Sequence, residues 1–494
     1  MTGKAQRNVK AQRNVKAQRN VKALCNVKAL CNVKAQRNVK APRNVKALRN
    51  VIGGFVLLLS LLAGPFSAGA VEVERVVSPG GIEAWLVEDH TNPIVALEIV
   101  FRGGSSLDPI GKEGLANFAA GTIDEGAGEL DSRGFQQELN DLAITLRFSA
   151  GTDNFNGTLR TLTENRARAF ELLRLALSEP RFDEEPVARI RAQIVASIRA
   201  GEEDPDVISS RTLREALFGE HPYARRREGT PETLDTIAPA DLRRFATERF
   251  ARDNLIVGVV GDVTPEELSD LLDSTFAGLP ERAAPIQVAE APLENDGTTI
   301  LVDMVIPQSV VVFGQRGIMR ADPDYYAAYM MNHILGGGSF SSRLYQEVRE
   351  KRGLAYSVYS FLNPMEHAAL VQGRVATQNG RVAESLDLIR AEWRRMAEEG
   401  PTHEELEHAR KFLTGSFPLR LSSSAAIAGM LVGIQLHDLG IDYLDRRNDL
   451  IDMITLEDVR RVARRLLDPE GLTVVVVGTP DGIEGVVREV TPGG

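Results

Sequence analysis

Two side chains in the second half of the chain, Arg349 and Tyr356, could donate hydrogen bonds to a carbonyl group or an anion. The guanidinium carries five N–H donors and the phenol carries one O–H. Arg349 falls in the last turn of an expected polar helix, which stops at Gly353, and Tyr356 falls on the alternating strand that follows. Neither side chain can activate water, so the pair alone predicts stabilisation of charge and no hydrolysis.

Three consecutive glycines, Gly336, Gly337 and Gly338, form a loop before this helix. They leave a backbone that another group can approach closely. The stretch does not match a phosphate loop, because neither Gly-Lys-Ser/Thr nor a Gly-x-Gly-x-x-Gly register is present. Composition alone favours a tight turn onto a helix with Ser339 as its N-cap.

The first 70 residues have the composition of a leader. Residues 1–51 contain eight copies of a six-residue unit, Lys-Ala-Gln-Arg-Asn-Val with drift at its middle positions, and have no apolar stripe. Such a low-complexity segment cannot bury a core, and a translated DNA repeat or a misplaced start codon is its simplest explanation. Residues 52–70 place a short apolar run between basic residues and Ala68-Gly69-Ala70. This pattern predicts a signal peptide cleaved after Ala70 and export, to the periplasm, with an uncleaved membrane anchor as the alternative.

Removal of this leader makes the chain strongly acidic. It takes away 14 of the 58 Lys and Arg residues and none of the 68 Asp and Glu residues, leaving a net charge of −24 on 424 residues. That charge argues against nucleic acid as a partner and suits basic peptides. The only cysteines, Cys25 and Cys31, lie in the leader. The mature chain therefore has no disulfide and depends on its hydrophobic core.

The remaining chain divides into two halves that repeat one order of elements. The first half covers 71–283, a linker covers 284–297, and the second half covers 298–494. Expected strands are 83–88, 94–101, 144–150, 155–162, 254–262, 298–305, 309–315, 354–362, 368–377 and 472–478; expected helices are 114–121, 132–142 with Ser132 as N-cap, 164–177, 184–200, one from Thr264, 325–335, 381–399, 403–417, 425–439 and 455–467. A repeat of this length predicts an α+β fold of two similar domains, each a mostly antiparallel sheet with helices packed on one face.

The order of elements and three motifs of the first half resemble the insulinase/pitrilysin family of zinc peptidases, over about residues 72–490. The motifs are Gly114-Leu115-Ala116, His221-Pro222-Tyr223-Ala224 and Val257-Gly258-Val259-Val260-Gly261-Asp262. The similarity is to the non-catalytic subunit type, of which the alpha subunit of mitochondrial processing peptidase is an example. In active members, His-x-x-Glu-His directly follows Gly-Leu-Ala, and its Glu activates the zinc-bound water.

The metal-site positions implied by this resemblance are degenerate. Asn117 and Gly121 stand in place of the two histidines, and Ala120 stands in place of the glutamate. Ser197 stands in place of a third ligand, a glutamate on a later helix. Zinc catalysis needs three protein ligands and one open position. We therefore expect no metal and no other cofactor in this chain.

A second group of charged residues, around His403 and His408, imitates a metal motif. The spacing of five residues puts the two histidines on different faces of a helix. We therefore expect only a solvated, capped helix start after Pro401-Thr402.

The resemblance also implies a role for Arg349 and Tyr356. In the family, the second domain presents an Arg and a Tyr, seven residues apart and flanking a glycine, toward the zinc site of the first domain. Such donors stabilise the oxyanion formed when water attacks a peptide bond, and the loss of one costs about 3 kcal/mol.

Two hypotheses follow for the function. In the first, the chain is the non-catalytic subunit of an exported heterodimeric peptidase. It binds the peptide substrate through Gly336–Gly338, Arg349 and Tyr356, and a catalytic family member with intact His-x-x-Glu-His supplies the zinc. In the second, it is a stand-alone peptide-binding or structural protein. Neither hypothesis includes stable membrane insertion after signal cleavage.

Overall fold

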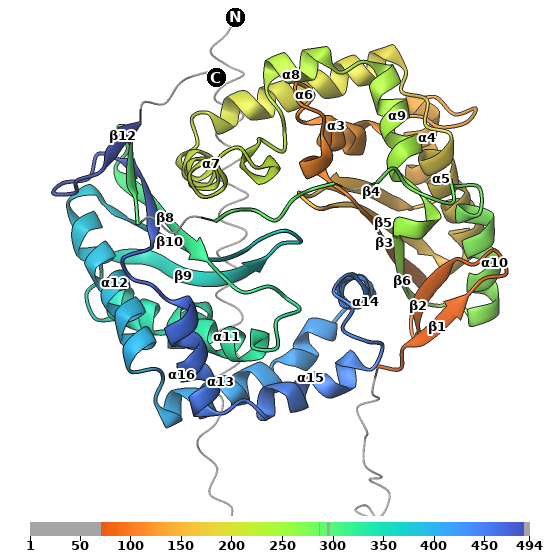
Figure 1. Ribbon diagram of the computed structural model, residues 1–494. Coiled ribbons are helices and arrows are strands. Elements are labelled where there is room, and N and C mark those ends of the chain that lie inside the picture. Colours follow the sequence, from red (N-terminus) through yellow and green to blue (C-terminus); the bar gives the residue numbers. More distant parts are fainter. Residues whose placement is uncertain (1–70, 286, 294–296, 489–494) are drawn as a thin grey trace, which may run out of the picture. The chain divides into compact units, whose positions relative to one another are not determined.

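The computed structural model describes residues 71–285, 287–293 and 297–488, all of which belong to one unit of the chain. Figure 1 shows this part as two groups of strands and helices that follow one another in sequence. The repeat segment, the signal peptide with its cleavage site, and both cysteines lie outside the described residues. The same holds for part of the expected linker.

The first half forms a six-stranded sheet with the order β1-β2-β6-β3-β5-β4. Its strands are β1 (Glu74–Val77), β2 (Glu83–Glu88), β3 (Ile94–Arg102), β4 (Thr145–Ala150), β5 (Asn154–Leu162) and β6 (Leu255–Gly261); its helices are α3 (Leu115–Thr122), α4 (Ser132–Asp141), α5 (Arg166–Ser178), α6 (Glu184–Gly201), α7 (Pro205–Phe218), α8 (Pro231–Thr236), α9 (Pro239–Arg249) and α10 (Pro265–Phe276). Each neighbouring pair is antiparallel except β2 and β6, which are parallel.

The second half forms a six-stranded sheet with the order β12-β7-β11-β8-β10-β9. Its strands are β7 (Thr299–Asp303), β8 (Gln308–Arg316), β9 (Ala355–Pro364), β10 (Ala369–Gln378), β11 (Thr473–Gly478) and β12 (Val486–Arg488); its helices are α11 (Tyr325–Asn332), α12 (Val382–Glu398), α13 (His403–Gly415), α14 (Ser424–Leu436), α15 (Tyr443–Asp452) and α16 (Leu456–Leu466). Strand β7 is parallel to both β11 and β12, and the other pairs are antiparallel.

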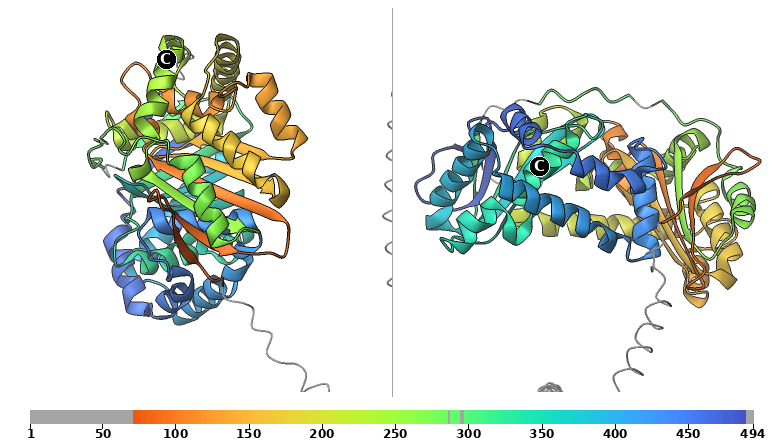
Figure 2. Two further views of the ribbon diagram at one scale, coloured as in Figure 1. Left: turned by 90° about the vertical axis from the view of Figure 1, so that its right-hand side faces the viewer. Right: turned by 90° about the horizontal axis from the view of Figure 1, so that it is seen from below.

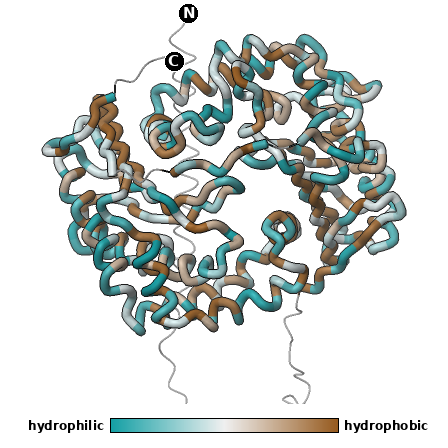
Figure 3. Tube along the Cα trace, viewed as in Figure 1, coloured by the Kyte–Doolittle hydropathy of each residue, from teal (hydrophilic) through white to brown (hydrophobic). Residues whose placement is uncertain are grey.

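The two sheets confirm the predicted α+β fold of two similar, mostly antiparallel domains. In each, a late Val-rich strand enters the middle of the sheet: β6 lies between β2 and β3, and β11 lies between β7 and β8. Such continuous apolar runs belong to strands that are buried on both faces. The apolar strands of the first sheet are visible on the right of Figure 3.

Each sheet also has a second face, which the sequence did not assign to any helix. Helices such as α5 and α10 cover one face of the first sheet (Figure 2), whereas α14 of the second half packs on β6 and β3. Conversely, α7 of the first half packs on β8 and β11. The expectation of helices on one face thus holds within each half, and the two halves exchange one helix each to cover the other face.

Several helices begin at a capping residue that can be recognised in the sequence. Thr264, Thr402 and Thr455 cap α10, α13 and α16 through capping boxes. The N-cap of α4 is Asp131, which accepts a hydrogen bond from the Gly134 N–H at 2.8 Å, so the prediction of Ser132 was wrong by one residue.

Among the described residues, no single helix is long and apolar enough to cross a membrane. One pair of segments, His403–Leu421 and Ser424–Leu436, meets the length and composition criteria together, with a bend of 117° between them.

Candidate functional site

The degenerate metal site begins on α3, which is held at its N-terminus by a buried carboxylate. Asp108 accepts hydrogen bonds from the Gly114 N–H at 2.9 Å and the Ala116 N–H at 3.0 Å. Gly114 has a φ of +95°, which favours glycine. Burial raises the pKa of Asp108 to about 7, although the backbone donors oppose this shift. These contacts fix the start of α3, on which the degenerate positions Asn117, Ala120 and Gly121 lie.

Helix α6 closes over the position of the second missing histidine. A Cβ atom placed on Gly121 would lie 3.1 Å from Cγ2 of Ile190, so a larger side chain there would require Ile190 to shift slightly. Ala120 is buried, Asn117 is half-buried, and Ser197 lies exposed two turns beyond Ile190 on α6. The structure thus places the four degenerate positions on two helices in contact, as the resemblance implies.

These helices do not assemble a set of metal ligands. Within residues 71–285, 287–293 and 297–488, no group of three or more His, Cys, Asp or Glu side chains is arranged to hold a metal ion. The helix start at His403 is capped by Thr402, with both His403 and His408 exposed, as the sequence predicted.

Arg349 and Tyr356 lie next to each other in the second half. The guanidinium carbon of Arg349 is 4.7 Å from the ring centre of Tyr345 and 4.9 Å from that of Tyr356, so it is held between two aromatic rings. One of its nitrogens also donates to the Tyr345 hydroxyl. Tyr356 is 82 % exposed. The sequence identified this pair but missed Tyr345, which lies one helical turn before Arg349.

The backbone around the pair differs from the expected loop and helix. Gly336 and Gly337 belong to a π-helical turn, η5 (His333–Gly337), that extends α11, and Arg349 belongs to a second one, η7 (Tyr345–Glu350). Gly336 is buried, and a Cβ atom on it would lie 2.6 Å from the Ser360 N of β9. The group that approaches this glycine closely is therefore a strand of the same chain.

The segment between the two π-helical turns also differs from the prediction that Ser339 caps a helix. Gly338 precedes a short turn, η6 (Ser339–Ser341), whose first residue has a φ of +49°. Ser339 caps no helix through its side chain, so that prediction was wrong. Gly337 is exposed and Gly338 is partly exposed, and their contact with a substrate stays a prediction.

The two groups of residues are held by separate sets of contacts. Helix α3 packs on α6, α9 and β4, whereas η7 packs on β9, α12 and η6. The structure therefore presents the degenerate metal site from the first half and the Arg349–Tyr356 pair from the second.

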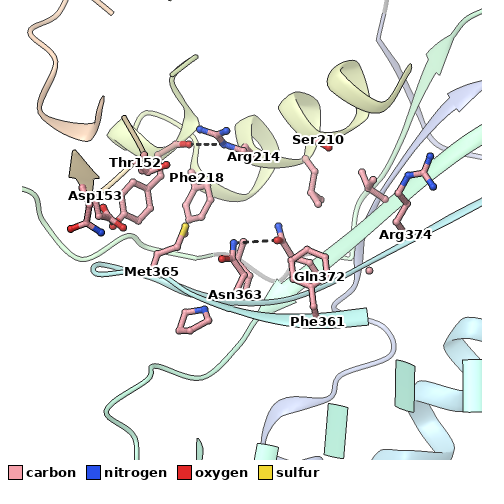
Figure 4. Close-up of a pocket in the computed structure, with 18 of the residues that line it drawn as sticks. Thr152, Asp153, Ser210, Arg214, Phe218, Phe361, Asn363, Met365, Gln372 and Arg374 are labelled. Atoms are coloured by element: carbon pink, nitrogen blue, oxygen red, sulfur yellow. Dashed lines mark hydrogen bonds between the residues drawn. The ribbon is translucent and has the colours of Figure 1, made fainter. Parts of the chain in front are cut away.

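A cavity of about 420 Å³ lies between the halves, and the sequence did not predict it. Helix α7 and the loop at 151–154 form one side, and the β9–β10 hairpin forms the other (Figure 4). Tyr359 and Phe361 of β9 line it together with the amides of Asn363 and Gln372, which hydrogen-bond at 3.3 Å. Strand β9 is an edge strand, and side chains of one of its faces border this space. Its outer edge contacts η5 and α11, and the Asn332 side chain donates to the Ser360 carbonyl at 3.2 Å.

Tyr223 joins the two halves beside this cavity. Its hydroxyl donates to Asp153 at 2.6 Å and accepts from the His367 N–H at 2.9 Å. Burial raises the pKa of Tyr223, and Asp153 adds to this effect, so the phenol stays protonated. The only signal in the sequence was the His-Pro-Tyr-Ala motif, and it gave no indication of this contact.

This fold and this site define a zinc-peptidase-like protein whose metal-binding positions carry no ligands. The chain belongs to the insulinase family: the model for Insulinase (Peptidase family M16) matches residues 84–231, and the model for the Peptidase M16 inactive domain matches residues 236–413. Two elements of the first half also fall within the second match: strand β6, which belongs to the first sheet, and helix α10, which packs on that sheet. With Asn, Ala, Gly and Ser at the motif positions, the chain is a non-catalytic member of the family.

Individual proteins resemble it over most of their length. The Non-peptidase homolog YmxG of Helicobacter pylori is 27 % identical over 423 residues, which cover 85 % of this chain and 98 % of that protein. The crystal structure of a peptidase M16 inactive domain from Pseudomonas fluorescens is 28 % identical with a TM-score of 0.78, covering 84 % of this chain and all of that one. A chain of Complex III2 from Candida albicans, 15 % identical with a TM-score of 0.71 over 83 % of this chain and 96 % of its own, shares the fold.

Proposed function

We propose that this chain is the non-catalytic subunit of an exported, heterodimeric zinc metallopeptidase. It binds the peptide substrate, and Arg349 and Tyr356 donate hydrogen bonds in the active site of a partner chain. The partner is a family member with an intact His-x-x-Glu-His motif and holds the zinc, whereas this chain holds no cofactor. The observation that carries the proposal is the exposed Arg349–Tyr356 pair.

Arg349 differs from the basic residues around it in its partners. Lys351 and Arg352 both pair with Glu347, at 2.5 and 2.7 Å. Among the described residues, Arg349 forms no ion pair with a carboxylate; it is held by the rings of Tyr345 and Tyr356 and by its hydrogen bond to the Tyr345 hydroxyl. A positioned guanidinium without a direct ion pair, beside an exposed phenol, is available to an oxyanion that develops on a bound peptide.

The cavity between α7 and the β9–β10 hairpin supports the peptide-binding part of the proposal. Its lining combines the rings of Tyr359 and Phe361 with the amide groups of Asn363 and Gln372. Apolar walls with a few placed polar groups are typical of ligand sites.

Export to the periplasm is supported by the signal-peptide pattern at residues 52–70. The alternative function, a stand-alone peptide-binding or structural protein, would use the same cavity and would need no partner. The Arg349–Tyr356 pair favours the first proposal, because a purely structural protein does not require this pair of donors.

The test is co-expression of this chain with a family member of the same organism that has an intact His-x-x-Glu-His motif. We expect a complex that cleaves a fluorogenic peptide library. Arg349→Ala or Tyr356→Phe should reduce kcat about 100-fold, because one oxyanion donor contributes about 3 kcal/mol.

The matched control is Arg381→Ala, which removes an exposed arginine that pairs with Glu384 on α12. It should leave cleavage unchanged. If a complex forms and both Arg349→Ala and Tyr356→Phe cleave at the wild-type rate, the role in the partner's active site is wrong. If no complex forms but the isolated chain binds peptides, the alternative function is supported.

A further inference from the structure

A second cavity, remote from the Arg349–Tyr356 pair, concentrates positive charge without any acidic residue. It has a volume of about 250 Å³ and lies where α11, η9 (Phe417–Leu421), α14 and α15 meet, in the lower part of Figure 1. Three arginines line it: Arg320, Arg420 and Arg447. No Asp or Glu is among its lining residues.

The arginines lack counter-ions. Among the described residues, no carboxylate forms an ion pair with Arg320, Arg420 or Arg447. Two acids close to Arg320 in sequence do not serve this purpose: Asp322 pairs with Arg465 at 2.6 Å, and Asp324 pairs with Arg461 at 2.6 Å. Asp438 lines a neighbouring cavity, which Arg320 also lines. This lack of counter-ions is unusual in a chain whose overall charge is negative.

Aromatic rings hold the guanidinium of Arg320 in place. Its central carbon lies 4.2 Å from the ring centre of Tyr325 and 5.2 Å from that of Tyr326. One nitrogen donates to the hydroxyls of Tyr326 at 3.1 Å and Tyr443 at 3.4 Å. Burial raises the pKa of Tyr443 to about 12, so this phenol is neutral and cannot balance the charge.

Arg447 is the most deeply buried arginine of this cavity, with 5 % of its surface exposed. Its guanidinium carbon lies 4.1 Å from the ring centre of Phe417. One nitrogen donates to the Leu413 carbonyl at 3.1 Å and to the Asn448 side chain at 3.0 Å. A buried cation with neutral partners alone is destabilising, and a bound anion would relieve this cost.

The rest of the wall is mostly apolar. It is formed by Phe417, Met430, Ile434 and Leu439, with the faces of the tyrosines, and His437 is its one further titratable side chain besides the tyrosines and arginines. Burial and the nearby Arg320 lower the pKa of His437, so this side chain adds no negative charge. The volume corresponds to about eight water molecules, so the cavity suits a small group. Arginine binds carboxylates through paired N–H donors.

We propose that this cavity binds a carboxylate carried on an apolar group. Two sources share this chemistry: the C-terminus of a peptide with an apolar last residue, and a free organic acid. The inference is independent of the proposed function, because it requires neither a catalytic partner nor the Arg349–Tyr356 pair.

The test measures binding to the isolated, full-length chain by isothermal titration calorimetry. Three probes are used: N-acetyl-Gly-Phe with a free carboxylate, the same dipeptide as its C-terminal amide, and phenylacetate. We expect the dipeptide acid to bind at least about tenfold more tightly than the amide, because the charged hydrogen bonds are lost in the amide. A dipeptide acid that binds more tightly than phenylacetate identifies a peptide terminus, and equal or weaker binding identifies a free acid.

Variants assign the binding to this cavity. Arg320→Gln and Arg420→Gln should each weaken binding of the acids about tenfold or more; Arg420 is exposed, so its replacement leaves folding intact. Arg147→Gln, at an exposed position on β4, is the matched control and should bind as the wild type does. The proposal is overturned if the acid and the amide bind equally, if neither acid binds, or if both cavity variants keep wild-type affinity.

Discussion

At the scale of single residues, Gly121 of α3 lies in close contact with Ile190 of α6. The Cγ2 atom of Ile190 fills the space where a side chain at position 121 would begin. The loss of the second histidine is therefore coupled to the packing of an apolar residue on the neighbouring helix. A histidine at position 121 would therefore require Ile190 to shift.

We predict that Gly121→His lowers the free energy of unfolding by about 1–3 kcal/mol, the range for overpacked cores. In the background of Ile190→Ala the same change should cost less, because the space is then available. Urea unfolding of the two single variants and the double variant measures this coupling. Strictly additive effects would contradict the contact between the two helices.

The contact between position 121 and Ile190 should also affect zinc binding by a variant in which the ligands are restored. The four changes Asn117→His, Ala120→Glu, Gly121→His and Ser197→Glu restore the motif of active members. We predict that stoichiometric zinc is retained only when Ile190→Ala is added, as measured by elemental analysis after dialysis. Stoichiometric zinc in the variant with only the four substitutions would contradict the role of Ile190. Stoichiometric zinc in the unaltered chain would contradict the absence of metal ligands.

At the scale of elements, one ion pair fixes the segment that carries Arg349 to the start of α13. Glu405 accepts hydrogen bonds from two nitrogens of Arg343, both at 2.7 Å, and from the Thr402 N–H at 2.7 Å. Arg343 is 6 % exposed and also donates to the Gly400 carbonyl. Burial opposes ionisation of Glu405, but these donors outweigh it and lower the pKa to about 2.

We predict that Glu405→Gln lowers the free energy of unfolding at pH 7 by about 3–5 kcal/mol, because it leaves a buried guanidinium unpaired. Since the folded-state pKa lies below the ordinary value of 4.5, the contribution is present above about pH 4.5. It is lost as the pH falls toward 2, so the difference between wild type and variant should shrink over that range.

Urea unfolding at pH 7, 5, 4 and 3 checks the pH dependence. The matched control is Glu404→Gln, because Glu404 is exposed on the same turn and caps nothing. Its effect should stay within about 0.5 kcal/mol at every pH. A Glu405→Gln difference that is constant with pH would contradict the assignment.

Elements with a local cause could be predicted from the sequence, and those with a distant cause could not. Capped helices such as α13 and Val-rich strands such as β6 carry their period and their end signals in their own residues. The π-helical turn at His333–Gly337 instead depends on the packing of Gly336 against Ser360 of β9. The Arg349–Tyr356 pair was found by its spacing, whereas the cavity beside β9 depends on α7, which comes from the other half.

At the scale of the whole described unit, the exchange of α7 and α14 couples the two halves. Gly258 of β6 allows α14 to approach closely, because a Cβ atom there would lie 2.7 Å from the Ala428 carbonyl oxygen. The Gln435 side chain of α14 also donates to the Val257 carbonyl at 3.0 Å. Each sheet therefore has one face that is buried from solvent only while the other half is folded. We therefore expect the two halves to unfold together.

The two tryptophans of the chain report on this coupling separately, because Trp85 lies on β2 beside α14 and Trp393 lies in the core of the second half. We predict that Trp85→Phe and Trp393→Phe, each leaving one fluorophore, give coincident urea transitions. Adding Gly258→Ala should separate them, with the Trp85 signal changing at the lower urea concentration, because the displaced α14 uncovers the first sheet. Gly429→Ala, on α14 with open space around its Cβ position, is the matched control and should keep the transitions together. Transitions that are already separate with Gly258 in place would show that the exchanged helices do not couple the halves.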